Sequence, residues 1–368
     1  MRLKLLMFFL LLAAANAAGK IPLPPSVRWI KLPTSQVEID GLPWYHENQG
    51  ELYRLPAALK NTYPVKVWNL AKSPSGGRIR FRTNARALAI RLEYPASPSM
   101  LNMEAYGQTG VDLYVGHTYW NTALADKDAK PGKIYEHVYF NFGNAPRVER
   151  DITLYLPLYM GVKVLAIGID SNAVMKPPRP FALPKPVVYY GTSITQGCCA
   201  SRSGMSYEAI VGRRLNLDFV NLGFSGAGFY EPALARAVAS IDAACYVLDG
   251  SNFGKVDEFR KVFAPFIETV RARHPKTPIL VISPLYSSGL LVQRHRNTSM
   301  WTFTRDVVSR FIAQGDKNIQ LIEGTDLLSP LQGDGLTDGL HPNDLGFDWV
   351  ANGITGRIAT VLGLDYPK

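Results

Sequence analysis

Three polar residues in the C-terminal half of the sequence are of the types needed for nucleophilic attack on a carbonyl carbon. Ser193 directly follows a short apolar run and a Gly-Thr pair, so we expect its hydroxyl on a tight turn at the end of a buried strand. His341 can act as a general base at neutral pH, and Asp338 can accept a hydrogen bond from its other ring nitrogen. Taken singly, each has a simpler explanation, with Ser193 as the N-cap of the next helix and His341 as an incidental turn residue.

Two further turns could supply donors for an oxyanion. Residues 221–228 form a Gly-rich turn after one apolar run, and residues 249–252 follow the next one and end in an asparagine. Backbone N–H groups and an asparagine amide can together bind a tetrahedral intermediate. Each turn alone is an ordinary connection between a strand and a helix.

The elements that must position these residues alternate between strand and helix. Short apolar runs predict strands, and amphipathic stretches between them predict helices, which is typical of a parallel sheet covered on both faces. Functional sites in such folds lie at the carboxyl ends of the strands. The predicted strands are 187–190, 219–222, 245–248, 279–282 and 319–322, and the predicted helices are 207–215, 232–240, 257–274, 301–314 and 347–362.

The N-terminal half has a different pattern. From about residue 27 to 173, apolar and polar residues alternate in short runs broken by Pro, Gly, Asn and Ser, which predicts antiparallel strands. The run Val65–Trp68 is one of these predicted strands. Seven or more strands without an evident helix between them favour an all-β sandwich or jelly-roll domain. Its aromatic residues could stack on sugars, although core packing is the simpler explanation for each: Trp44, Trp68, Tyr119 and Trp120.

Residue composition, hydrophobic pattern and a Pro-rich stretch divide the 368 residues into four segments. Residues 1–18 have the basic start, apolar run and small-residue end of a cleaved signal peptide, and the apolar run is too short for a comfortable membrane span. Residues 19–175 form the β-domain, 176–186 a Pro-rich linker, and 187–368 the α/β domain. We therefore expect a secreted or periplasmic protein without stable membrane insertion. The net charge of +10 is spread over both halves and no nucleic-acid motif accompanies it, so nucleic acid is not an expected partner.

The order of these motifs resembles the SGNH (GDSL-type) hydrolase superfamily over about residues 187–362. The resemblance implies a flavodoxin-like three-layer domain in which Ser193 is the nucleophile and Asp338 and His341 complete the triad. It also implies an oxyanion hole made by the Ser193 N–H, Gly226 and the Asn252 side chain. Thr192 and Phe253 depart from the commonest family motif, but neither is a triad position.

A narrower resemblance covers most of the remaining chain. The stretch Gly-Thr-Ser-Ile-Thr-Gln-Gly, followed closely by Cys-Ala-Ser-Arg, and an upstream Gly-x-Asp-Leu-Tyr at 110–114 are similar to a two-domain subfamily that looks like carbohydrate esterases. This resemblance makes Asp112, Tyr114 and Trp120 candidates for substrate binding. Asp112 is equally explained as a turn or interface residue.

Together these patterns predict a serine esterase that removes small acyl groups, especially acetyl, from carbohydrate or polysaccharide. An acyltransferase on the same scaffold and a noncatalytic carbohydrate-binding protein are the alternatives. We expect no cofactor and no metal. The three cysteines, Cys198, Cys199 and Cys245, do not suggest a disulfide framework, because Cys245 is predicted at the opposite end of its strand and bonding between adjacent cysteines is strained.

Overall fold

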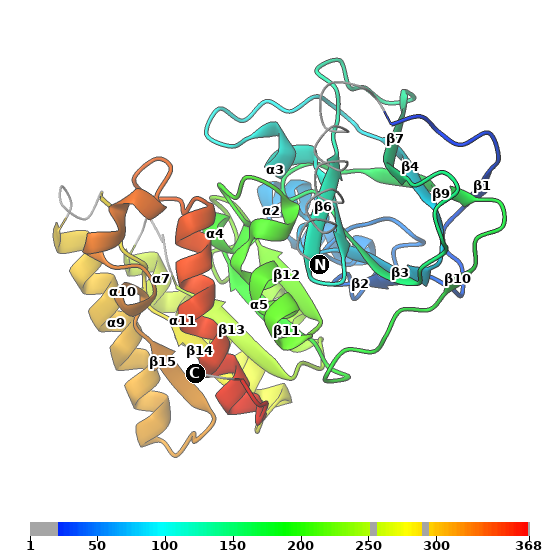
Figure 1. Cartoon of the computed structure of the whole chain (residues 1–368). Coiled ribbons are helices and arrows are strands. Elements are labelled where there is room, and N and C mark those ends of the chain that lie inside the picture. The colour runs from blue at the N-terminus through cyan, green and yellow to red at the C-terminus, as the bar shows by residue number, and fades with distance from the viewer. Residues whose placement is uncertain (1–20, 251–255, 289–293, 367–368) are drawn as a thin grey trace, which may run out of the picture.

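The computed structural model describes residues 21–250, 256–288 and 294–366. The predicted signal peptide, residues 1–18, lies outside the described residues. Figure 1 shows two assemblies of strands, one built by the N-terminal part of the chain and one by the C-terminal part.

Two antiparallel sheets form the N-terminal part. One has the strand order β1-β9-β4-β7, and the other has the order β10-β3-β8-β5-β6 with β2 paired to β3. Side chains from both sheets, including Phe81, Ile90 and Leu113, share one hydrophobic core, as expected for a sandwich. The jelly-roll connectivity stays a prediction. The strands are β1 Val27–Ile30, β2 Glu38–Asp40, β3 Arg78–Thr83, β4 Ala87–Glu93, β5 Val111–Val115, β6 Thr118–Ala123, β7 Ile134–Asn141, β8 Arg150–Tyr155, β9 Lys163–Asp170 and β10 Met175–Lys176.

Helices also occur in this part, contrary to the sequence prediction. The run Val65–Trp68, predicted as a strand, is the start of helix α2 (Val65–Ala71). The prediction was wrong because a run of four residues is too short to distinguish the two-residue period of a strand from the 3.6-residue period of a helix. Over the whole of α2 the helical period is visible, since Val67 and Ala71 lie four residues apart and are both buried. Two short helical segments accompany it, η2 (Ala57–Thr62) and α3 (Ala105–Thr109).

The C-terminal part is a five-stranded parallel sheet, which confirms the predicted α/β class. Its order is β12-β11-β13-β14-β15, the 2-1-3-4-5 order of flavodoxin-like folds. Adjacent residues of β11 enter opposite cores, because side chains alternate across a sheet: Val188 faces one and Tyr189 the other. The strands are β11 Val187–Gly191, β12 Phe219–Gly223, β13 Cys245–Asp249, β14 Ile279–Ile282 and β15 Ile319–Ile322.

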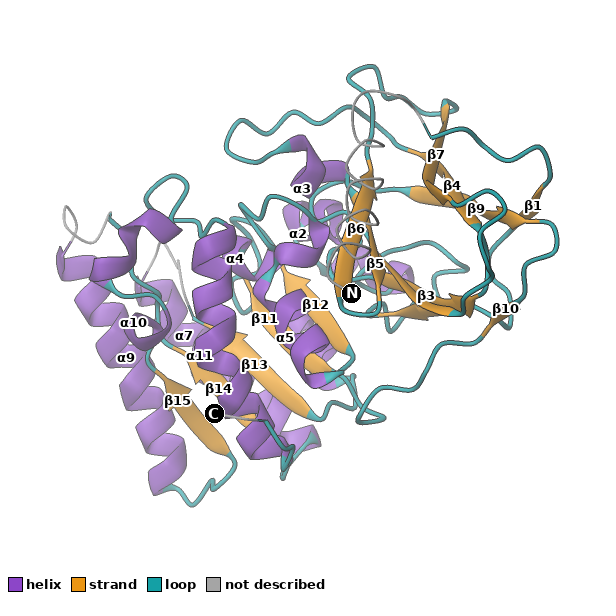
Figure 2. Ribbon diagram, viewed as in Figure 1, coloured by secondary structure: helices purple, strands orange, loops and turns teal. Residues whose placement is uncertain are grey.

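Helices cover both faces of this sheet (Figure 2). Helices α6, α7 and α9 supply one core, and α5 and α11 supply the other. Their bounds are α5 Tyr207–Leu215, α6 Pro232–Ala239, α7 Val256–Arg273, α9 Arg294–Ala313 and α11 Asp344–Leu362. Helix α11 begins three residues before the predicted start, where Asn343 caps it by accepting hydrogen bonds from the N–H groups of Leu345 and Gly346. None of the helices in the described ranges is long and apolar enough to cross a membrane.

N-terminal residues pack into both cores of the C-terminal sheet. Trp44, Leu55, Tyr63 and Val67 are buried in the same cluster as strand and helix residues of the parallel sheet. The core that α5 and α11 supply also buries Met103, Tyr114, Tyr155 and Leu158. The two parts are therefore joined by a continuous hydrophobic contact as well as by the chain.

Candidate active site

Ser193 occupies the position expected from the sequence. It is the first residue of the short helix α4 (Ser193–Gln196), which follows β11 after Thr192, and only 3% of its surface is exposed. Gly191 permits this sharp connection, because a Cβ there would lie 2.2 Å from Thr195 Oγ1. The hydroxyl is thus held at the carboxyl end of a central strand.

The structure brings Ser193, His341 and Asp338 together. His341 Nε2 lies 2.9 Å from Ser193 Oγ, and His341 Nδ1 lies 2.7 Å from Asp338 Oδ2. Both distances are within hydrogen-bonding range. The arrangement can carry a proton from the hydroxyl to the imidazole while the carboxylate orients the ring.

Asp338 is held in its ionised form. Burial by itself raises the pKa of this carboxyl, but hydrogen bonds from the backbone N–H and imidazole of His341 and from the Asn102 side chain outweigh burial. The pKa of Asp338 therefore lies well below its usual value. A carboxylate is present next to the imidazole throughout the neutral range.

The predicted oxyanion turn follows β12. Gly226 has a φ of +57°, a left-handed conformation that favours glycine. The turn is tied to the nucleophile segment at two points, since Phe224 N–H donates to Gly191 O at 3.0 Å and Ser225 N–H donates to Gln196 Oε1 at 2.9 Å. Asn252, the predicted side-chain donor, lies outside the described residues.

Three N-terminal side chains reach this site, and the sequence reasoning missed all of them. Asn102 Nδ2 donates to Asp338 Oδ2 at 3.1 Å, and Lys66 Nζ donates to Gly226 O at 2.9 Å. Tyr159 Oη donates to Ser193 O at 3.3 Å. These residues carry no local motif, so nothing in the sequence distinguished them from surface residues.

Arg54, a further residue of the N-terminal part, binds the strand that precedes the predicted oxyanion turn. Its guanidinium is fully buried and donates to the carbonyl oxygens of Asn221 and Gly223 on β12, as well as to those of Ser73 and Leu70. Burial lowers the pKa of Arg54 to about 9, so it stays charged at neutral pH. Strand β12, which leads into the predicted oxyanion turn, is thereby fixed to the N-terminal part.

The candidate substrate-binding residues lie in two different environments. Asp112 and Tyr114 are buried, and they hold the loop after α4: Asp112 accepts from Gly204 N–H at 2.8 Å, and Arg202 donates to Tyr114 Oη at 2.5 Å. Burial raises the pKa of Asp112. Trp120 is 38% exposed and packs edge-on against Phe140. The first two therefore position a loop, whereas Trp120 offers an open aromatic surface.

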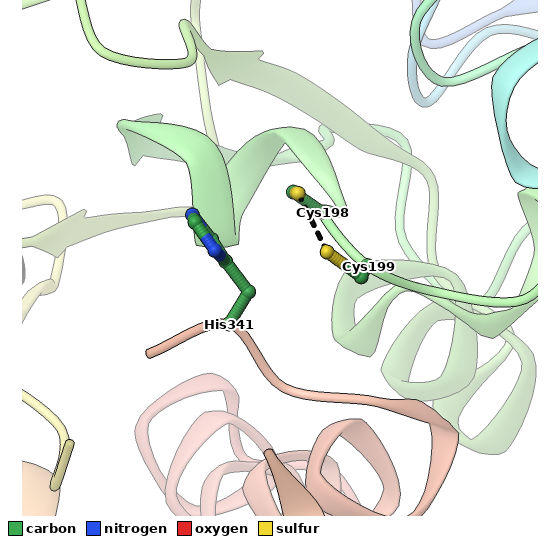
Figure 3. A group of neighbouring side chains, drawn as sticks. All are labelled: Cys198, Cys199 and His341. Atoms are coloured by element: carbon green, nitrogen blue, oxygen red, sulfur yellow. Dashed lines mark hydrogen bonds between the residues drawn. The ribbon is translucent and has the colours of Figure 1, made fainter. Parts of the chain in front are cut away.

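A group of soft ligands adjoins His341. The Sγ atoms of Cys198 and Cys199 lie 2.9 Å apart, and together with a ring nitrogen of His341 they fall within 4.8 Å of one another (Figure 3). Among the described residues this is the group of His, Cys, Asp and Glu side chains that could hold a metal ion. A pocket of about 720 Å³ lies beside it, lined by Met100, Leu101, Asn102, Met103, Glu104, Cys199, Ser201, Thr337, Asn343, Asp344 and Leu345.

Comparison with known families gives a match for each part of the chain. Residues 184–358 match the GDSL-like lipase/acylhydrolase family. Residues 27–175 match the family described as the N-terminus of SGNH-hydrolase-type esterases and named for its Gly-x-Asp-Leu-Tyr motif. No curated protein sequence matches the chain.

Solved structures resemble both parts at once. A protein from Bacteroides ovatus described as a GDSL-like lipase is 29% identical, with a TM-score of 0.77 over 93% of this chain and 100% of its own. The salicylyl-acyltransferase SsfX3 from a tetracycline biosynthetic pathway is 21% identical, with a TM-score of 0.77 over 93% of this chain and 99% of its own. An acetyl xylan esterase from Butyrivibrio proteoclasticus is 12% identical, with a TM-score of 0.61 over 92% and 99%. At these low identities, the similarity to the acyltransferase and to the acetyl xylan esterase shows a shared fold only.

Proposed function

Residues 184–358 of this chain belong to the GDSL-like lipase/acylhydrolase family, and from this premise we propose that the protein is a secreted serine esterase that removes small acyl groups, chiefly acetyl, from carbohydrate. The observation that carries the proposal is the continuous hydrogen-bonded chain from Ser193 through His341 to Asp338. The apolar run with a basic start in residues 1–18 supports the secretion part of the proposal.

In the proposed acylation step, His341 Nε2 takes the proton of Ser193 Oγ as this oxygen attacks the ester carbonyl. The carbonyl oxygen becomes an oxyanion, which the N–H groups of Ser193 and Gly226 and the side chain of Asn252 stabilise. His341 then gives the proton to the departing sugar hydroxyl, leaving an acyl group on Ser193. Each oxyanion donor contributes about 10²–10³ in kcat.

In the proposed deacylation step, water takes the place of the sugar. His341 removes a proton from the water as it attacks the acyl-enzyme, and the same donors stabilise the second oxyanion. His341 then returns the proton to Ser193 Oγ, and the free acid leaves. Asp338 stays ionised throughout and stabilises the imidazolium that forms in each step.

A pocket next to the triad, lined by the Asn102 that donates to Asp338, supports a carbohydrate ester as substrate. The pocket of about 720 Å³ beside Cys199 has apolar and polar walls, as expected for a sugar ring with hydroxyl groups. The fold likeness to an acetyl xylan esterase supports an acetyl group on a polysaccharide.

The proposal is tested by Ser193→Ala in the purified protein, with Ser240→Ala as the matched control. Ser240 lies at the end of α6, where its hydroxyl donates to Ala237 O. We expect hydrolysis of 4-nitrophenyl acetate and release of acetate from acetylated xylan or mannan to disappear in the first variant only. Equal turnover in both variants, or an inactive parent protein that still binds glycans, would refute the esterase.

Acyl transfer is the second candidate, because the fold matches the salicylyl-acyltransferase with a TM-score of 0.77. An alcohol acceptor would replace water in the second step. Partitioning of the acyl group between water and added sugar alcohols, followed by mass spectrometry, separates the two reactions. Acetate as the main product supports the esterase, and acylated acceptor at millimolar sugar supports the transferase.

A further inference from the structure

Two cysteines close to the proposed nucleophile take no part in the proposed hydrolysis. Cys198 and Cys199 are buried with free thiols, and their sulfur atoms are 2.9 Å apart. Figure 3 shows the two sulfur atoms beside the imidazole of His341. One ligand atom from each of the three residues falls within a span of 4.8 Å.

We propose that Cys198, Cys199 and His341 form an inhibitory binding site for a thiophilic divalent cation of the zinc class. Two thiolates and one imidazole are a ligand set that favours Zn²⁺ or Cd²⁺ over Mg²⁺ and Ca²⁺. Three protein ligands leave the fourth tetrahedral position for water, as in open zinc sites.

The present geometry is close to that of such a site. A zinc–sulfur bond of about 2.3 Å in a tetrahedral arrangement places two sulfur atoms about 3.8 Å apart. The two sulfur atoms, now 2.9 Å apart, must therefore separate by about 0.9 Å. The same geometry places the imidazole nitrogen about 3.5 Å from each sulfur, and this nitrogen now lies within 4.8 Å of both. Cys199 lines the pocket of about 720 Å³, so an ion has a path to the first thiolate. Cys198 lies deeper, with its sulfur 3.9 Å from Asn102 Nδ2.

Binding of a metal ion to His341 would interrupt the hydrogen-bonded chain from Ser193 to Asp338. Both ring nitrogens of His341 are already engaged, one with Ser193 and the other with Asp338. An ion that binds either nitrogen breaks one of these hydrogen bonds. Two sulfur–metal bonds and one nitrogen–metal bond form as three water molecules leave the hydration shell of the ion. Two thiol protons pass to solvent, the imidazole keeps its one proton on the nitrogen that does not bind, and no electron is transferred. Inhibition follows only if His341 is the general base, so this consequence rests on the proposed function, whereas binding does not.

Cys245 provides the matched control. It is fully buried at the start of β13, whereas the nucleophile segment follows the carboxyl end of the neighbouring strand β11. If the cation bound any thiol of the protein, Cys245→Ala would weaken its binding as much as Cys198→Ala or Cys199→Ala does.

The binding test uses Co²⁺ as a spectroscopic probe on protein reduced with a phosphine and freed of chelator. We expect a thiolate-to-cobalt charge-transfer band with 1:1 stoichiometry in the parent, in Cys245→Ala and in the inactive Ser193→Ala. The band should disappear in Cys198→Ala and Cys199→Ala, and His341→Ala should bind at least about tenfold more weakly. A parent without the band, a band that survives loss of either cysteine, or unchanged affinity in His341→Ala would overturn the site.

The inhibition test measures 4-nitrophenyl acetate hydrolysis against Zn²⁺, each variant being compared with its own metal-free rate. We expect full inhibition of the parent and of Cys245→Ala, reversal by a chelator, and no effect of Mg²⁺ or Ca²⁺. The Zn²⁺ midpoint should rise at least about tenfold in Cys198→Ala and Cys199→Ala. An equal midpoint in all variants overturns the inhibitory role. A parent without esterase activity refutes the proposed function instead, and the cobalt band still decides the site.

Discussion

The two parts of the molecule contribute differently to the candidate site. The groups proposed to react all come from the C-terminal part: Ser193 begins the short helix α4 after β11, and Asp338 and His341 lie in the loop before α11. The N-terminal part supplies none of them, yet Asn102 and Lys66 donate hydrogen bonds to Asp338 and to the oxyanion turn. The parallel sheet thus brings together the groups proposed to react, and the N-terminal part holds Asp338 and the proposed oxyanion turn by hydrogen bonds.

This difference has a physical basis in the topology. Parallel strands collect their following loops at one edge, so the sheet brings distant residues together without help. Loops are less constrained than the strands they follow, and their exact geometry needs further contacts. Here those contacts come from across the boundary between the two parts, and we expect their removal to weaken catalysis without removing any reacting group.

The largest effect is expected at Arg54, which joins the two parts through buried hydrogen bonds. Arg54→Ala leaves four backbone carbonyl groups without their charged donor and opens a cavity, so we expect a loss of about 3–5 kcal/mol in the free energy of unfolding. Urea denaturation measures this loss. Arg54→Lys keeps the charge but not the forked geometry of the guanidinium, so its free energy of unfolding should lie between those of the parent and of Arg54→Ala.

The control for Arg54 is Arg260→Ala on the exposed surface of α7. Arg260 pairs with Asp257 three residues away; the Arg260 side chain is about half exposed and the Asp257 side chain is largely exposed. We expect its stability to change by less than about 0.5–1 kcal/mol. Similar losses in the two arginine variants would show that the parts are not joined through Arg54.

A smaller effect is expected at Asn102, which we propose as a positioning residue for Asp338. Asn102→Ala removes a hydrogen bond to an ionised group, and we expect kcat to fall about tenfold with little change in KM. Asn102→Asp should lose more, because it places a second negative charge beside the carboxylate. Steady-state kinetics with 4-nitrophenyl acetate measures both, with the exposed Asn69→Ala as control. A raised KM with unchanged kcat would mean that Asn102 contacts the substrate instead.

The sequence predicted the C-terminal part closely because its signals are local. Strand 279–282 is a continuous apolar run and is buried throughout, whereas 319–322 is apolar except for the exposed Gln320; the predicted bounds of both match those of β14 and β15. Ser193 and His341 could be selected because their types and their places after strands limit the chemistry. The structure places their side chains in contact, whereas their catalytic roles stay a prediction.

The N-terminal contribution could not be predicted in the same way. Asn102 and Lys66 act only through residues 236 and 160 positions away in the chain, and a single sequence contains no signal for such pairs. Helix α2, which carries Lys66, was predicted as a strand, so even its surface could not be oriented correctly. Contacts between the parts depend on tertiary packing, which local periodicity does not encode.

The smallest effect is expected at Lys66, whose exposed ammonium group donates a hydrogen bond to the proposed oxyanion turn. Its Nζ donates to Gly226 O, and this carbonyl and the proposed oxyanion N–H flank the same Cα. Lys66→Met keeps the apolar stem but frees the turn, so we expect kcat to fall about two- to tenfold at unchanged KM and stability. Lys60→Met removes the same charge elsewhere on the N-terminal part and should leave kcat unchanged. Because the contact acts through the turn proposed to stabilise the developing oxyanion, the loss should be greater for an alkyl acetate than for 4-nitrophenyl acetate, whose better leaving group makes the tetrahedral step easier. Equal losses for both esters would indicate that Lys66 acts through the net charge of the surface and not through the geometry of the turn.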